Sequence, residues 1–230
     1  MIDCLGNCVT CLKVNHSLFD ELSTKELEVL NLYRTRTIIK KGEFLYREGD
    51  VMPGLICLNT GKVKLVKQGE IENEFIVSLH KTVDFVGFDD LMSNQLCSTS
   101  AIALEDVAVC TIMKEQFLKV IEQNASLALK IIKFQAEQLI DKQNRLINIA
   151  QKNLDARLAY TLLHLSDFFC DSKNQQVSIH TFKRRELAAL SSMNTANAIR
   201  TLTKFKQKGW ISIEKKAIIV LDKTQLLSLL

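Results

Sequence analysis

The residues from Lys183 to Trp210 predict two short amphipathic helices joined by a tight turn at 191–193. Asn194 is placed to cap the second helix, because its side-chain oxygen can accept an otherwise unpaired N–H. Gly209 is a natural stop just beyond that helix. Apolar side chains recur at the three- and four-residue steps of buried helix faces: Leu187, Leu190, Met193, Ala198, Leu202 and Phe205. This pattern predicts a helix-turn-helix, a motif that offers its second helix to the major groove of DNA.

One outward face of the second helix is polar and basic. Residues three and four apart share a helix face, which groups Asn197, Arg200, Thr201 and Lys204. Arg200 is the candidate for reading a base, since a guanidinium can grip guanine O6 and N7. Lys183, Arg184 and Lys204 are expected mainly to contact phosphates. The full set expected to contact DNA is Lys183, Arg184, Asn194, Thr195, Asn197, Arg200, Thr201 and Lys204. The alternative is an ordinary helical hairpin with a solvated basic face.

The distribution of charge favours DNA. Residues 1–150 hold 17 Lys and Arg against 20 Asp and Glu, a net charge of −3, whereas residues 151–230 hold 13 against 6, a net charge of +7. Basic residues gathered beside a helix pair suit contacts with phosphates. After the helices, residues 210–214 and 217–221 alternate or run apolar around Lys215 and Lys216. They predict a two-stranded wing with a basic tip, and the module is therefore a winged helix.

Short apolar strands separated by glycines occupy the chain from about Thr37 to Ile112. They are expected at residues 37–39, 44–46, 55–58, 62–66, 75–79, 84–87 and 107–112. Short strands at regular intervals, with turn signals between them, predict an antiparallel barrel or roll. The expected fold class is α+β, with an N-terminal antiparallel β-roll over residues 1–113, a helix over 114–150 and the winged helix over 151–230.

The region from Lys114 to Ala150 predicts a long, uninterrupted helix with an apolar seam. Residues at alternating three- and four-residue steps are Leu129, Ile132, Ala136, Leu139, Gln143, Leu146 and Ala150. One polar residue within such a seam is typical of a two-stranded coiled coil. The expected dimer interface comprises Ile132, Ala136, Leu139, Asp141, Gln143 and Leu146. The alternative is that the stripe is buried against the chain's own barrel.

Cysteine usage and hydropathy indicate where the protein works. The seven cysteines are an odd number, and the start of the chain leaves no room for the apolar core of a signal peptide. We therefore expect a reducing cytoplasm rather than a disulfide framework. No apolar run approaches the roughly 20 residues needed to span a bilayer, so no membrane partner is expected.

The order of β-roll, long helix and winged helix resembles the Crp/Fnr family of bacterial transcription regulators. The similarity is carried by residues 39–50, 59–64, 84–89 and 152–159 and by the helix pair up to Trp210. It implies a homodimer that is not an enzyme, binds double-stranded palindromic DNA and works with RNA polymerase. It also implies that the β-roll is a jelly roll similar to cyclic-nucleotide-binding domains.

The family's cyclic-AMP receptor branch binds its nucleotide with a Gly-Glu-Leu turn and an Arg-Ser/Thr pair. Here the turn is Gly87-Phe88-Asp89, and Cys97 precedes Ser98 where the arginine belongs. Losing a bidentate guanidinium removes the principal charge partner of a phosphate. A cyclic nucleotide is therefore rejected as the ligand.

The chain is more similar to the oxygen-sensing fumarate-nitrate reduction branch, which carries an iron–sulfur cluster. That resemblance implies a [4Fe–4S] cluster on Cys4, Cys8, Cys11 and Cys110. The branch's last N-terminal ligand would fall at Ser17, so Cys4 or an oxygen ligand must take its place. Zinc on the same cysteines and no metal are the alternatives. Asp141 matches an aspartate thought to oppose dimerisation in this branch; the alternative is an exposed helical aspartate.

The recognition helix departs from the family at two positions. The glutamate that commonly lies four residues before the base-reading arginine is Ala196, and Ile199 takes another position that is often polar. The DNA sequence read is expected to differ accordingly, through Asn197, Thr201 or a methyl contact from Ala196.

Two other classes of function are weighed beside DNA binding. Cys8-Val9-Thr10-Cys11 could serve a small thiol-redox enzyme, but the βαβ context of such enzymes is missing. A ligand-binding regulatory protein that acts through protein partners is the other alternative.

Overall fold

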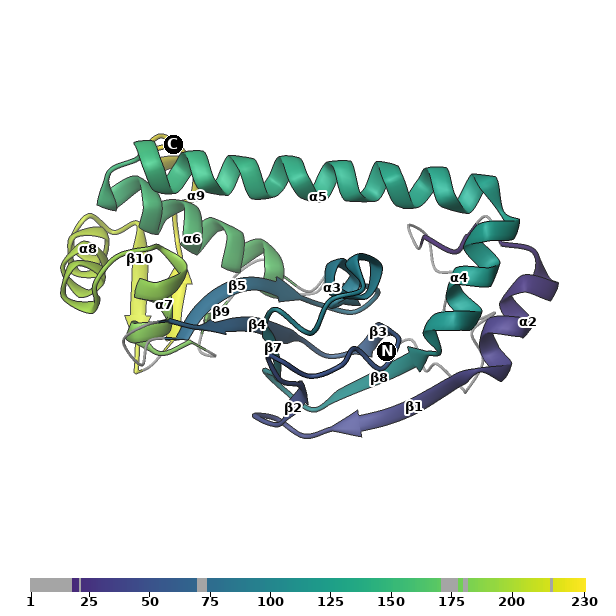
Figure 1. Ribbon diagram of the computed structural model, residues 1–230. Helices are drawn as coiled ribbons and strands as arrows, with labels where there is room; N and C mark the ends of the chain where they lie inside the picture. Colours follow the sequence, from purple (N-terminus) through teal and green to yellow (C-terminus); the bar gives the residue numbers. More distant parts are fainter. Residues whose placement is uncertain (1–17, 21, 70–73, 171–177, 180–181, 216) are drawn as a thin grey trace. The chain divides into compact units, whose positions relative to one another are not determined.

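The computed structural model describes residues 18–20, 22–69, 74–170, 178–179, 182–215 and 217–230 (Figure 1). The predicted cluster ligands Cys4, Cys8 and Cys11 lie outside these residues. The chain divides into two compact units, one ending at Leu139 and the other beginning at Ile140. Each unit is described by itself. Among the described helices, none combines the length and apolar character that crossing a membrane requires.

Two four-stranded antiparallel sheets form the N-terminal unit. Their strand orders are β1-β8-β3-β6 and β2-β7-β4-β5. The strands are β1 Arg34–Ile39, β2 Phe44–Tyr46, β3 Leu55–Thr60, β4 Val63–Gln68, β5 Glu74–His80, β6 Phe85–Val86, β7 Ser100–Ala103 and β8 Val107–Ile112. The predicted antiparallel β-roll is confirmed, and every strand expected from the sequence is present. Strand β7 was not expected, because its short Ser-Ala-Ile-Ala run lacks the β-branched and aromatic enrichment that marks strands.

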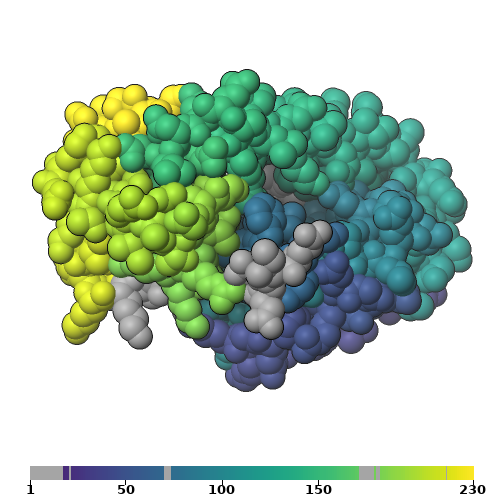
Figure 2. Space-filling model, turned by 60° about the vertical axis from the view of Figure 1, so that its left-hand side comes forward, coloured from purple at the N-terminus to yellow at the C-terminus, as the bar shows by residue number. Residues whose placement is uncertain are grey.

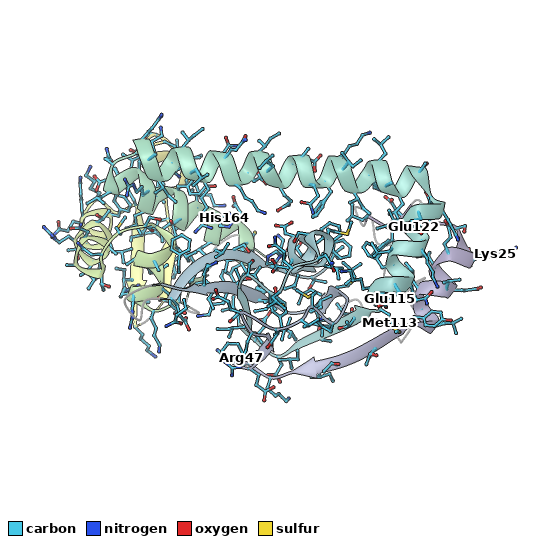
Figure 3. All side chains as sticks on the ribbon, viewed as in Figure 1. Lys25, Arg47, Met113, Glu115, Glu122 and His164 are labelled. Carbon is cyan, nitrogen blue, oxygen red and sulfur yellow. The ribbon has the colours of Figure 1, made fainter. Side chains whose placement is uncertain are left out.

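Helices close the N-terminal unit at the ends of its strands. Helix α2 leads into β1 and helix α4 follows β8, and the two helices pack together beside that end of the sheet (Figure 1). In Figure 3 the labelled side chains of Glu115 and Glu122 follow α4, while Lys25 lies on α2. The helices of this unit are α2 Thr24–Leu32, α3 Phe88–Ser93, α4 Lys114–Gln123 and the first half of α5 Ala125–Gln151.

The prediction of one uninterrupted helix over 114–150 is wrong, because the helix is broken at Asn124. This residue ends α4 with an extended backbone, φ −129° and ψ 93°. Its side-chain oxygen then accepts the N–H of Leu127 at 2.9 Å, which caps the start of α5. Asparagine competes in this way with the helical backbone hydrogen bonds, and two helices result in place of one.

Aromatic rings join the strands and helices of this unit into one core. Phe19 and Phe117 meet edge to face at 6.1 Å, and Phe85 contacts both Phe88 and Phe134. Edge-to-face pairs are favoured because the positive ring edge meets the negative ring face. Leu127, on the first turn of α5, is fully buried in the same core. The start of α5 is thereby fixed to the β-roll by apolar packing.

The C-terminal unit is a winged helix whose scaffold is helix α6. This helix packs against α7, α8 and α9, and the three-stranded sheet β10-β11-β9 completes the fold. Its elements are α6 Leu154–Phe169, β9 Ser178–Ile179, α7 Arg184–Leu190, α8 Thr195–Gln207, β10 Ile211–Glu214, β11 Ala217–Val220 and α9 Lys223–Leu227. The predicted wing is confirmed, with Lys215 at its tip in a left-handed conformation (φ 54°). Strand β9 adds a third member that was not expected.

Candidate nucleic-acid interface

Local capping bonds define both helices of the predicted pair. The Glu186 carboxylate accepts the N–H of Lys183 at 2.8 Å, so that α7 begins where its first turn meets a negative charge. The side-chain oxygen of Asn194 accepts the N–H of Asn197 at 2.8 Å, as predicted for the cap of α8. Helix α8 ends at Gln207, and Gly209 beyond it has φ +73°. The predicted stop at this glycine is confirmed.

Helix α6 holds the turn between α7 and α8 in place. Arg157 donates one hydrogen bond to the carbonyl oxygen of Lys152 at 2.9 Å and another to that of Ser192 at 3.1 Å. The buried hydroxyl of Ser191 donates to Thr161 Oγ1 at 2.9 Å. The turn itself contains Ser192 at φ 50°, in the left-handed region. These bonds fix the angle at which α8 leaves the turn.

The buried face of α8 includes a residue that the sequence placed outside. Ala198, Leu202 and Phe205 are buried as predicted. Thr201 is also buried, with 6 % of its surface exposed, so the prediction that it shares the outward face with Arg200 is wrong. At 100° per residue, Thr201 lies only about 40° from Phe205 on the helix circumference. The packing of α8 on its neighbours includes this position, and Thr201 is therefore unable to contact DNA.

The outward face of α8 lies opposite these buried residues. It is formed by Ala196, Ile199, Arg200, Thr203, Lys206 and Gln207. Figure 1 shows α8 beside α7 and β10. Figure 2 shows α7 and α8 (yellow-green) at the surface of this unit. Thr203 and Gln207 were missed by the sequence analysis. Their positions, seven and eleven residues after Ala196, follow the spacing of one helix face and could have revealed them.

The guanidinium of Arg200 is held in one direction by its own helix. Its Nη2 donates to the side-chain oxygen of Asn197 at 2.8 Å. Both residues belong to the predicted DNA-contacting set, and the structure brings them together. A planar fork held in this way loses less rotamer freedom when it forms a second pair of hydrogen bonds. Arg200 is thus prepared to grip two acceptors on a base edge.

Basic side chains lie on several elements of this unit. Lys183 is exposed at the start of α7, and Lys215 is exposed at the wing tip. Partial burial lowers the pKa of the Arg184 guanidinium, which is half-buried beside them. Lys208 lies over the ring of Trp210 at 4.3 Å from its centroid. Lys204, predicted to contact phosphate, instead pairs with Asp155 of α6 in this unit.

The segment that follows β6 carries a buried carboxylate. Asp90 of α3, with 7 % of its surface exposed, accepts the N–H of Ser98 at 3.0 Å. Phe88 is buried in the core. Gly87 has φ +70°, and a β-carbon there would lie 2.2 Å from Met52 Cε and 2.9 Å from the Tyr46 hydroxyl. The left-handed backbone angle favours glycine here, whereas the side-chain ends of Met52 and Tyr46 could shift to admit a β-carbon.

Cys97, which the family resemblance matches to a phosphate-binding arginine, is buried. Burial, with the nearby carboxylates of Asp90 and Asp50, raises the pKa of its thiol to about 11. A thiol of this kind carries no charge at neutral pH. A further arginine of this β-roll, Arg47, stacks over the ring of Phe44 at 3.6 Å on β2 (Figure 3).

Of the predicted cluster ligands, the described residues include Cys110 alone. It is buried in β8, opposite Cys57 of β3, and Arg34 of β1 donates to its sulfur at 3.4 Å. Hydrogen bonds to sulfur are among the contacts that tune iron–sulfur clusters, so this environment of Cys110 is compatible with a cluster ligand. Within the part of the chain that the structure describes, no three metal-binding side chains come together.

The predicted seam of α5 is exposed on the described chain. Leu129, Ile132, Leu139 and Leu146 each expose more than half of their surface. A different stripe, Leu127 and Ile131, is buried in the core of the N-terminal unit. The alternative that the seam packs against the chain's own barrel is therefore wrong.

Asp141 does not belong to this seam. It lies two residues from both Leu139 and Gln143, which is about 200° around the helix from each. Asp141 is exposed, but its side chain leaves α5 on the side away from the apolar stripe. Helical geometry therefore separates Asp141 from the other predicted members, and its place in a dimer interface stays a prediction.

Comparison with known proteins matches both units. A cyclic nucleotide-binding domain model matches residues 36–124, and a Crp-like helix-turn-helix domain model matches residues 156–229. The transcriptional activator protein anr of Pseudomonas aeruginosa is 27% identical over 229 residues, which are 97% of this chain and 92% of that protein. The fumarate and nitrate reduction regulatory protein of Vibrio cholerae is 25% identical over 228 residues, covering 98% and 91%. The structure of FixK2 from Bradyrhizobium japonicum shares the fold, with a TM-score of 0.74 at 19% identity, over 85% of this chain and 96% of that one.

Proposed function

The chain belongs to the Crp/Fnr family of transcription regulators, and on this premise we propose that it binds a two-fold symmetric DNA site as a homodimer. Each α8 would enter the major groove of one half-site, with the half-sites about one helical turn apart. The observation that carries this proposal is the outward face of α8, where Asn197 holds the Arg200 guanidinium.

The charge and the scaffold of the winged helix support DNA as the ligand. The region from residue 151 onward has a net charge of +7, and exposed Lys183 and Lys215 flank the helix pair. When such cations bind the phosphates of DNA, counterions condensed on the DNA are released. This release supplies binding affinity that does not depend on the base sequence. Lys204 is tied to Asp155 and therefore contributes less to this term than Lys183.

Self-association is supported by the exposed seam on α5. Leucine and isoleucine side chains at coiled-coil spacing are left in solvent over four turns of the described helix. A second copy of the same helix would cover them in a parallel pair with Gln143 as the polar member. The same two-fold axis would then set the spacing of the two α8 helices.

The sensor signal is proposed to be redox or oxygen rather than a cyclic nucleotide. The buried thiol of Cys97 replaces a phosphate-binding arginine, and Asp90 already places a negative charge at the Ser98 N–H. A cyclic phosphate would meet repulsion there and no charge partner.

A metal centre on cysteines is the other half of this sensor proposal. Cys4, Cys8, Cys11 and Cys110 would hold a [4Fe–4S] cluster, and Arg34 would support the Cys110 sulfur. When bound, the cluster supplies a redox-active centre whose potential depends on such contacts. The alternative is zinc on the same cysteines, and elemental analysis distinguishes zinc from an iron–sulfur cluster.

The protein is further proposed to act in the cytoplasm and to contact RNA polymerase.

Selection from a random DNA pool tests the DNA-binding proposal. Full-length protein is purified anaerobically, and bound duplexes are sequenced after several rounds. Enrichment of a palindrome with half-site centres 10 to 10.5 base pairs apart is expected. Failure to enrich any sequence, at low salt and both with and without oxygen, would overturn the proposal.

Anaerobic purification with an absorption spectrum and analysis of iron, sulfide and zinc tests the metal proposal. Bound iron and sulfide that the Cys110→Ser variant loses are expected. Colourless, metal-free protein that still binds the selected palindrome would overturn the cluster.

A further inference from the structure

We propose that α8 reads thymine methyl groups next to the guanine that Arg200 grips, through Ile199, Ala196 and Thr203. Each half-site would then combine one G·C pair with neighbouring thymines. This inference rests on the proposed DNA binding and adds which bases are read.

The exposed apolar side chain on α8 is the first observation. Ile199 leaves 48% of its surface in solvent, directly beside Arg200 on the outward face. Ala196 is exposed one turn earlier on the same face. In the major groove, the thymine C5-methyl is the apolar group that a base edge presents. An exposed isoleucine at this position therefore matches thymine better than any other base.

Thr203 adds a third apolar contact through its methyl group. Its hydroxyl donates to the carbonyl oxygen of Ile199 at 2.9 Å. Because the hydroxyl proton is used within the helix, Thr203 has no donor left for a base. Its methyl group and the lone pairs of its oxygen are what it can offer to the groove.

The other readout chemistries are missing from α8 or already engaged. The helix contains no Asp or Glu, the side chains that accept from cytosine N4. Asn197 could grip adenine with its amide, but its oxygen accepts from Arg200. The oxygen of Asn194 is taken by the cap of α8. Apart from Lys206 and Gln207 in the last turn of α8, what remains on the outward face is one guanidinium and a group of methyl-bearing side chains.

Replacement of thymine by deoxyuridine isolates the methyl contact. Uracil keeps the O4 acceptor and the pairing of thymine and lacks only the C5-methyl group. The palindrome obtained by selection with full-length protein is resynthesised as a series of duplexes. Each duplex carries uracil in place of thymine at one position, in both half-sites. Binding is measured by fluorescence anisotropy at one fixed salt concentration.

At one or more positions beside the guanine, uracil is expected to weaken binding by about fourfold per half-site, the effect of one buried methyl. Substitution in both half-sites should therefore weaken it by about 15-fold. At the position that Ile199 reads, the Ile199→Ala variant is expected to bind the thymine and uracil duplexes almost equally. The Lys206→Ala variant, altered on the flank of the same face, should keep the full difference.

The outcomes separate this inference from the proposal beneath it. Tight binding to the palindrome with no uracil effect at any position would overturn methyl readout and leave DNA binding intact. A uracil penalty that Ile199→Ala retains in full at every position would overturn the role of Ile199. Failure to select any sequence would overturn the DNA-binding proposal itself. Ile199 and Lys206 are both exposed, so both variants are expected to fold. Circular dichroism checks this.

Discussion

The carboxylate of Asp90 lies 3.0 Å from the backbone nitrogen of Ser98 and accepts its hydrogen bond within the β-roll. This bond ties α3 to the segment that leads into β7. In nucleotide-binding members of the family, the equivalent of Ser98 belongs to the pair that holds the cyclic phosphate. We propose that the Asp90 carboxylate, close to that position, disfavours a cyclic phosphate there.

Replacing Asp90 with alanine is expected to destabilise the N-terminal unit. The N–H of Ser98 would lose its charged acceptor in this part-buried bond, at a cost of about 1–3 kcal/mol. The Asp90→Asn variant keeps a neutral acceptor and should lose less. Urea unfolding of full-length protein measures both differences, and an alanine variant as stable as the parent would refute the structural role of this bond.

Raising the pH from about 9 to about 11 is expected to destabilise the fold through Cys97. Burial and nearby carboxylates raise the pKa of its thiol to about 11 in the folded protein. The stability that the folded state gains by keeping this thiol protonated is therefore complete below the ordinary pKa of a cysteine. It is lost as the pH rises through the raised pKa. Burial raises the pKa of Tyr46 in the same direction. The urea midpoint of unfolding should fall less steeply across this pH range for Cys97→Ala than for the parent protein. The same fall in both proteins would show that the Cys97 thiol does not cause the loss of stability.

The cap of α8 should be measurable as stability of the winged helix. Asn194→Ala removes the acceptor for the Asn197 N–H and is expected to cost about 1 kcal/mol. Asn194→Asp retains an acceptor, and Thr195→Ala, one position further on, serves as the matched control. Chemical denaturation compares the three variants. The cap would be unimportant if alanine at 194 proved no more costly than alanine at 195.

A charge in the exposed seam of α5 should separate the proposed dimer. Leu146→Asp would place two carboxylates in an apolar interface, and the dimer dissociation constant is expected to rise by more than about tenfold. Analytical ultracentrifugation measures this. Asp141→Ala, on the other side of the helix, should leave dimerisation unchanged. A stronger dimer in that variant would instead support the charge repulsion suggested by family resemblance.

Removing the base-reading guanidinium should relax the sequence that is read. Arg200→Ala is expected to cost about 1–3 kcal/mol of DNA binding and to lose selectivity at one base pair. Asn197→Ala should weaken selectivity at the same base pair by a smaller amount, because it only orients Arg200. Binding to the four single-base variants of the palindrome tests both. An equal loss on all four duplexes would make Arg200 a phosphate contact.

Several elements of the site were predictable because their causes are local. The cap at Asn194 and the stop at Gly209 depend on a few neighbouring backbone groups. Strands such as β8 were visible in the apolar run of residues 107–112. The break at Asn124 is equally local, but an asparagine within an apolar pattern gives no sign of whether its side chain will cap a new helix.

The amino-acid sequence by itself determined the periodicities, the caps, the charge asymmetry and the residues that resemble a family of regulators. Only the tertiary structure decided which way shared-face residues point. Thr201 is buried because the turn bound by Arg157 and Thr161 sets the rotation of α8 about its own axis. Asp90 meets Ser98 because the chain turns back on α3 before it enters β7. The contacts of Arg157 and Thr161 with the turn join residues distant along the chain, and helical or strand spacing carries no information about them.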